Sequence, residues 1–121
     1  MGTYLINHLR IPGGIPNDAG LAYFDQVEST AKPYGARWLA QSDVKVVEGA
    51  WPGSVVLMEF PSMANAQSWY NSSDYQKILP LRVNNAISDL ILVDGVRPGF
   101  TVAGFAQEIR AATRKASSAG R

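Results

Sequence analysis

His8 and Glu59 are the two residues whose side-chain chemistry stands out most from their surroundings. His8 is the only histidine of the chain and lies in a largely apolar segment. Glu59 is the single charged residue in the apolar run from 54 to 60. If these two segments form neighbouring parallel strands, His8 and Glu59 lie level on one face. A carboxylate beside an imidazole orients it for proton transfer, so we predict an acid/base pair, although a satisfied polar pair in a dimer core has the same residues.

Arg37 and Arg82 are single arginines among apolar neighbours. A guanidinium binds a carboxylate through two parallel hydrogen bonds, so each arginine is a candidate anchor for an acidic ligand. Each would equally form a structural ion pair, because Glu48, Glu59 and Asp89 are available as partners.

Trp51, Trp69 and Tyr75 are candidate pocket walls. Aromatic side chains with polar tips often line sites for planar ligands. Trp69 and Tyr75 also have the spacing of helix residues that simply fill a core. Trp51 precedes a Pro-Gly turn and is the least typical of a core position.

The composition excludes several classes of function. The 121 residues contain no cysteine, so disulfides, thiolate metal sites and cysteine nucleophiles are absent. With one histidine and no carboxylate spacing of a ligand loop, we expect no metal and no other cofactor. The formal charge of +1 and the few, scattered basic residues near the C-terminus predict no nucleic-acid partner. No apolar run reaches about 20 residues and no signal peptide is recognisable, so we expect a cytoplasmic protein that does not bind membranes.

Apolar patterning and breaker residues predict the elements. Strands are expected at 4–11, 37–41, 44–48, 54–60 and 88–94. One helix should start at Asn17 or Asp18 and run to Ala31, with a stripe of Leu21, Phe24, Val27 and Ala31. A second should start at Ser62, pause at 71–74 and break at Pro80. A C-terminal segment keeps helical spacing at Phe105, Ile109, Ala112 and Ala116.

This order predicts a βαββαβ ferredoxin-like fold, an antiparallel sheet with two helices on one face. The strands at 54–60 and 88–94 are apolar on both faces, whereas two helices cover only one. A second copy of the chain is the simplest cover, so we expect a homodimer. Residues 1–96 would form the domain, and 97–121 a helical extension that docks on the dimer.

Several segments resemble the domain of unknown function 1330 family over about residues 4–96. They are 32–39, 48–52, 56–62, 69–75, 79–82 and 88–95, which fall in the family's order. The resemblance implies a dimeric α+β barrel, in a superfamily that includes small monooxygenases and isomerases, and implies no established activity. The family usually has a basic residue where Ser54 stands, so an anionic ligand that depends on that residue is not expected here.

Two functions stay open at this stage. The first is a homodimer that binds a small, partly apolar molecule between sheet and helices, with His8 and Glu59 as catalytic pair if it is a cofactor-independent enzyme. In that case Arg37, Arg82, Trp51, Trp69 and Tyr75 bind the ligand. The second is a non-catalytic binding or structural dimer. An open cavity that touches His8, Glu59 or an arginine would favour the first function, and a close-packed interior with every polar group paired would rule it out.

Overall fold

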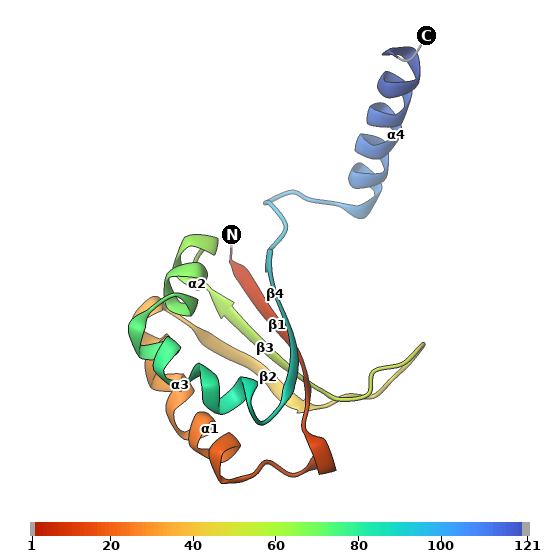
Figure 1. The fold of residues 1–121 in the computed structure, drawn as a ribbon. Helices are drawn as coiled ribbons and strands as arrows, with labels where there is room; N and C mark the ends of the chain where they lie inside the picture. The colour runs from red at the N-terminus through yellow and green to blue at the C-terminus, as the bar shows by residue number, and fades with distance from the viewer. Residues whose placement is uncertain (1, 120–121) are drawn as a thin grey trace.

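The computed structural model describes residues 2–119, which form one sheet, three helices packed on it and a separate C-terminal helix (Figure 1). The strands are β1 (Thr3–Arg10), β2 (Arg37–Asp43), β3 (Ser54–Phe60) and β4 (Ile87–Asp94). The α-helices are α1 (Asp18–Ala31), α2 (Met63–Tyr70), α3 (Ser73–Val83) and α4 (Val102–Ala119). Short 3₁₀ turns are η1 (Pro12–Gly14) and η2 (Lys32–Tyr34).

The sheet has the order β2-β3-β1-β4, and every neighbouring pair is antiparallel. Helices α1, α2 and α3 cover one face, so the fold is ferredoxin-like, as predicted. The expected parallel pairing of the first and central strands is wrong. The crossover through α1 makes β2 parallel to β1, and β3 then returns beside β2 and lies between the two, so it runs against both.

The two faces of the sheet differ in what covers them. In β1, the odd-numbered residues Leu5, Asn7 and Leu9 are buried under the helices, and the even-numbered ones point to the other face, as the alternation predicted. We call this second face the open face. Its β4 positions are exposed: Ile87 by 58%, Ile91 by 56% and Val93 by 43%. The helices of one chain therefore leave this face of β4 uncovered, as expected when the helices lie on one side of the sheet.

Helix α1 begins where the sequence indicated, because the Asn17 side chain accepts a hydrogen bond from the Gly20 amide. Its buried stripe is Tyr23, Val27 and Ala31. Leu21, which we expected in this stripe, is 47% exposed. The helix is therefore rotated so that Tyr23 rather than Leu21 is buried against the rest of the domain.

The predicted break at Pro80 is wrong. Pro80 lies inside α3, and the chain continues helically to Val83. The helix starts within the expected pause at 71–74, where the Ser72 hydroxyl accepts a hydrogen bond from the Tyr75 amide. Residues 44–48 form no strand but part of a long arm between β2 and β3 that extends beyond the sheet (Figure 1).

Helix α4 stands away from the rest of the molecule and packs closely on none of the other described helices or strands (Figure 1). Thr101 caps it by accepting a hydrogen bond from the Gly104 amide. Over residues 2–119, no helix is both long and apolar enough to cross a lipid bilayer.

Candidate functional site

The most unusual polar cluster of the molecule is buried between α1, α3 and the sheet. Tyr23 of α1 and Tyr75 of α3 share a hydrogen bond, with 2.9 Å between their hydroxyl oxygens. Arg82 lies about two turns further along the same face of α3 and donates from Nη2 to the Tyr75 hydroxyl at 3.3 Å. Its guanidinium carbon lies 5.9 Å from the centre of the Tyr23 ring. We call these three residues the Arg82 cluster.

Arg82 is only 8% exposed, yet none of the described carboxylates forms an ion pair with it. Its Nε is buried without a hydrogen-bond partner in the described chain. A buried charge normally has a counter-charge, because transfer out of water is costly. Tyr23 does not supply one. Burial, with help from Tyr75, raises the pKa of Tyr23 far above the usual value of about 10, so its hydroxyl stays neutral at physiological pH.

A cavity of about 30 Å³ adjoins Arg82 and Tyr23. Its other walls are mostly apolar: Leu9, Ile11, Pro16, Gly20, Phe24, Leu81, Asn85 and Ala86. It shares Ile11, Asn85 and Ala86 with a wider outer depression of about 410 Å³. The outer depression therefore lies next to the cavity that Arg82 lines.

A second cavity of about 30 Å³ lies on the other side of Tyr23 and is lined by Trp69 and Tyr75 among others. Asn7 belongs to the β1 face under the helices and is placed between Leu5, which lines this cavity, and Leu9, which lines the first. Asn7 is 4% exposed and its Oδ1 has no partner among the described residues. A buried acceptor without a partner is rare, and it adds a second unsatisfied polar group to this layer.

Three of the predicted ligand residues, Arg82, Tyr75 and Trp69, thus meet on the helix side of the sheet. Trp69 is 1% exposed and donates from Nε1 to the Thr30 hydroxyl at 3.0 Å, so it is also a core residue. The sequence reading missed Tyr23 and gave no role to Asn7. Tyr23, Val27 and Ala31 have helical spacing, so a stripe that includes tyrosine would have revealed the first.

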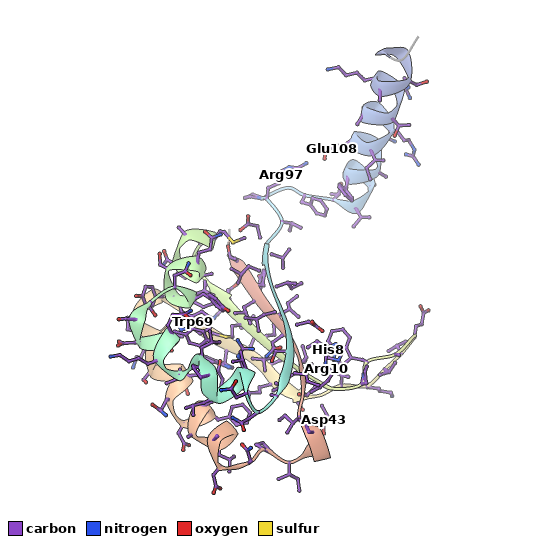
Figure 2. The ribbon with its side chains drawn as sticks, in the orientation of Figure 1. His8, Arg10, Asp43, Trp69, Arg97 and Glu108 are labelled. Carbon is purple, nitrogen blue, oxygen red and sulfur yellow. The ribbon has the colours of Figure 1, made fainter. Side chains whose placement is uncertain are left out.

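The predicted His8–Glu59 pair does not exist. Because β1 and β3 are antiparallel, His8 pairs with Val55 and Glu59 pairs with Tyr4, four residues away along the strand. That separation is about 13 Å at the usual rise of a strand. Both residues lie on the open face, because they pair with or belong to the even-numbered positions of β1. Figure 2 shows His8 on this side of the sheet and Trp69 on the helix side. They therefore do not line the cavities between sheet and helices.

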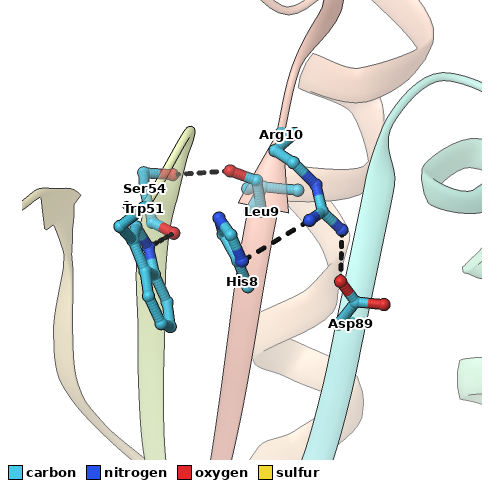
Figure 3. Close-up of polar contacts among 6 residues, drawn as sticks. All are labelled: His8, Leu9, Arg10, Trp51, Ser54 and Asp89. Atoms are coloured by element: carbon cyan, nitrogen blue, oxygen red, sulfur yellow. Dashed lines mark hydrogen bonds and ion pairs between the residues drawn. The ribbon is translucent and has the colours of Figure 1, made fainter. Parts of the chain in front are cut away.

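His8 belongs to a separate group on the open face (Figure 3). Its ring stacks on Trp51, with 4.0 Å between ring centres. Arg10 approaches His8 Nδ1 at 3.4 Å and forms an ion pair with Asp89 at 2.5 Å. The other ring nitrogen of His8, Nε2, is buried without a partner in the described chain. Trp51 is thus a neighbour of His8 and not a wall of the predicted pocket.

Arg37 is bound to Glu59 by a hydrogen-bonded ion pair of 2.6 Å at the far end of the open face. The Arg37 hydrogen bond lowers the pKa of the Glu59 carboxyl, although partial burial acts in the opposite direction. The Arg37 side chain is 70% exposed. Of the two readings that the sequence allowed for Arg37, the ion pair is the one the structure contains.

The described residues contain no group of three histidines or carboxylates placed to hold a metal ion. Neither small cavity is lined by a carboxylate or an imidazole in the described chain. The polar side chains that line them are the Arg82 guanidinium, the phenols of Tyr23 and Tyr75, the amides of Gln41 and Asn85, and the indoles of Trp38 and Trp69. This set favours the binding of an acidic ligand over acid/base catalysis by the protein itself.

The fold and the layer between its sheet and helices define a ferredoxin-like α+β protein with an internal polar cluster. The chain belongs to the family described as Domain of unknown function (DUF1330), whose model matches residues 3–96. Helix α4 lies outside the match. A search of curated proteins finds no match.

Solved structures with this fold include proteins of several descriptions. RPA0582, a protein of unknown function from Rhodopseudomonas palustris, is 18% identical with a TM-score of 0.63, over 80% of this chain and 84% of its own. A dimeric ferredoxin-like protein of unknown function from Jannaschia sp. is 9% identical with a TM-score of 0.57, over 78% and 100%. SnoaB, a cofactor-independent oxygenase from Streptomyces nogalater, is 8% identical with a TM-score of 0.53, over 83% and 97%. At these identities the likeness concerns the fold.

Proposed function

We propose that the protein binds a small organic acid in the layer between sheet and helices, with Arg82 as the anchor for the acidic group. The observation that carries the proposal is the buried guanidinium without a counter-charge beside an apolar cavity. A ligand carboxylate, or an enolate or phenolate oxygen, would supply the missing negative charge. The apolar walls would contact the rest of the ligand.

The two tyrosines set the polarity of this site. Burial raises the pKa of Tyr23, so its hydroxyl keeps its proton. The Tyr23–Tyr75 hydrogen bond uses one hydroxyl proton, and a second hydroxyl proton would be available to an oxygen acceptor on a ligand. A neutral phenol and a guanidinium together select an anionic oxygen over a cation or an apolar group.

Binding, rather than catalysis, is the activity we propose. A cofactor-independent reaction at this site would need a base, and His8 and Glu59 lie on the opposite face of the sheet. The cofactor-independent oxygenase among the similar folds makes oxygenation a reasonable second test, in which Arg82 would stabilise an enolate that the substrate itself forms.

The homodimer belongs to the same proposal. The open face presents Ile91 and Val93, which are 56% and 43% exposed, beside the partly buried Ile6, Val55 and Leu57. A contiguous apolar sheet face is normally buried, and a two-fold axis allows one copy to cover the other. Dimeric proteins with this fold support the same arrangement.

The test of ligand binding compares acetate with acetamide, which has nearly the same size but no charge and suits a cavity of about 30 Å³. Isothermal titration calorimetry should show acetate binding to the unmodified protein and none for acetamide. Arg82→Met should lose acetate binding. Arg37→Gln, which removes an arginine from the opposite face, should keep it. Equal binding of the two probes, or equal binding by Arg82→Met and the unmodified protein, would disprove the anchor.

Stability of the same variant separates binding from a structural role. A buried cation without a counter-charge lowers stability, so Arg82→Met should leave the free energy of unfolding unchanged or raise it in the absence of ligand. If Arg82 instead serves the alternative function of a non-catalytic structural dimer, its loss should cost about 3–5 kcal/mol and no acid should bind. Urea unfolding followed by circular dichroism gives this value.

A further inference from the structure

Helix α4 carries an apolar stripe that nothing in the described chain covers. Val102 is 74% exposed, Phe105 49% and Ile109 51%. Ala112 and Ala116 continue the stripe, so the spacings are three, four, three and four residues. This is the a/d pattern of a helix that packs along another helix. The charged residues Arg110 and Arg114 lie outside the stripe, at positions that face water.

The start of helix α4 contacts the segment that precedes it and does not pack on the described part of the sheet domain. Arg97 forms an ion pair of 2.6 Å with Glu108, and its guanidinium carbon lies 5.7 Å from the Phe100 ring centre. Phe100 in turn contacts Phe105, with 6.0 Å between ring centres. Figure 2 shows Arg97 and Glu108 at this junction, away from the sheet. These contacts fix the start of the helix and leave most of its apolar stripe free for a partner.

We infer that α4 pairs with α4 of a second copy of the chain, in antiparallel orientation. The stripe has large residues in its first half, Phe105 and Ile109, and small ones in its second half, Ala112 and Ala116. In an antiparallel pair, a positions face d positions, so Phe105 faces Ala116 of the other copy and Ile109 faces Ala112. In a parallel pair, the large residues would face each other and the alanines would leave gaps.

The charges beside the stripe favour the same orientation. Glu108 and Lys115 occupy the two equivalent flanking positions of consecutive heptads. In the antiparallel pair, Glu108 of each copy lies near Lys115 of the other, which forms two opposite-charge contacts. Arg97 occupies only one carboxylate oxygen of Glu108, so the other oxygen is free to accept from lysine.

This interface is separate from the open face of the sheet and from the Arg82 cluster. It lies in the part of the chain outside the family match, so it is a feature of this protein rather than of the domain. Because the stripe is short, we expect the α4 pair to stabilise a dimer that also has other contacts, and not to hold two copies together by itself.

Distances between paired spin labels test the orientation. The chain has no cysteine, so Ala103→Cys and Ala111→Cys each introduce one labelling site on an exposed part of α4. In the antiparallel pair, residue 103 is displaced from its equivalent by roughly 20 Å along the axis, whereas residue 111 is almost level with its own. We therefore expect a clearly longer distance at 103 than at 111. Equal distances at both sites, or no interchain distance at either, would overturn the inference.

Two further variants test whether the stripe holds the copies together. Ile109→Asp should weaken self-association at least tenfold in sedimentation equilibrium, whereas Gln107→Asp on the water-facing side should leave it unchanged. Equal effects of the two variants would contradict the pairing.

Sedimentation of the full chain with vesicles of anionic lipid tests whether the stripe binds a membrane instead. Vesicle binding that Ile109→Asp abolishes, without any change in self-association, would assign the stripe to a membrane and overturn the inference.

Discussion

At the scale of single residues, the contacts of the Arg82 cluster give the guanidinium of Arg82 no counter-charge. The Tyr23 hydroxyl and the Tyr75 hydroxyl satisfy each other, and Tyr75 also accepts from Arg82. Burial without a carboxylate makes the guanidinium expensive for the unliganded protein. Residues that cost stability and fill no packing role are commonly found at binding sites.

Tyr23 should give the protein a characteristic alkaline response. Burial raises its pKa in the folded state, so the folded protein keeps a proton that the unfolded chain releases above about pH 10. The free energy of unfolding should be level below that pH and fall above it by about 1.4 kcal/mol per pH unit. Tyr23→Phe should remove this slope, measured by urea unfolding at several pH values. An unchanged slope in the variant would contradict the assignment.

At the scale of elements, the site depends on how α1 is joined to β2. Gly35 ends η2 with a φ of 78°, and a Cβ on it would lie 2.7 Å from Pro61 Cγ. The turn between α1 and β2 therefore packs tightly against Pro61, which connects β3 to α2. The cap of Ser72 on the Tyr75 amide sets the start of α3 in the layer between sheet and helices.

Gly35→Ala should therefore destabilise the fold by more than its backbone conformation explains. A left-handed φ costs a residue with a Cβ about 1–2 kcal/mol, and the contact with Pro61 adds to this. Gly49→Ala is the matched control, since Gly49 has a φ of 79° and nothing within 4 Å of the added atom. We expect Gly35→Ala to lower the free energy of unfolding by at least about 1 kcal/mol more than the control. Equal losses would show that Pro61 is not a constraint.

At the scale of the whole molecule, the helices cover one face of the sheet and leave the other to a partner. The arm between β2 and β3 and helix α4 both project from the domain (Figure 1). On the arm, Trp51 stacks on His8 and so borders the open face. In the proposed dimer, the His8 group would be buried beside the second copy, which gives these polar residues a structural setting distinct from the acid site.

Ile91→Lys should disrupt the proposed sheet dimer while the domain stays folded. The residue is 56% exposed on β4, so lysine is accommodated in the single chain but would be buried at the interface. Loss of a central contact of this kind costs about 2 kcal/mol or more, which raises the dimer dissociation constant roughly 30-fold. Val83→Lys is the control, because Val83 is 52% exposed on α3, away from the open face. If light scattering shows that the unmodified protein is a monomer at micromolar concentration, the proposed dimer is refuted.

The sequence by itself determined the features that depend on local patterns. Alternation along residues 4–11 assigned each β1 side chain to its face, and Asn17 and Ser62 marked the starts of α1 and α2. Element order was enough for the ferredoxin-like fold, and blocks of residues for the family. Arg82, Tyr75 and Trp69 were recognisable as candidates because their chemistry is unusual for their surroundings.

Only the tertiary structure decided which of these residues meet. Strand direction depends on how β3 inserts between β1 and β2, and this separates His8 from Glu59 along the sheet. The rotation of α1 depends on packing, because the Tyr75 hydroxyl that bonds to Tyr23 comes from α3, 52 residues away in the chain. Whether Arg82 has a counter-charge is a property of three-dimensional neighbours, because residues far apart in the chain surround it. The candidate site is therefore a consequence of packing between elements that the sequence identifies one at a time.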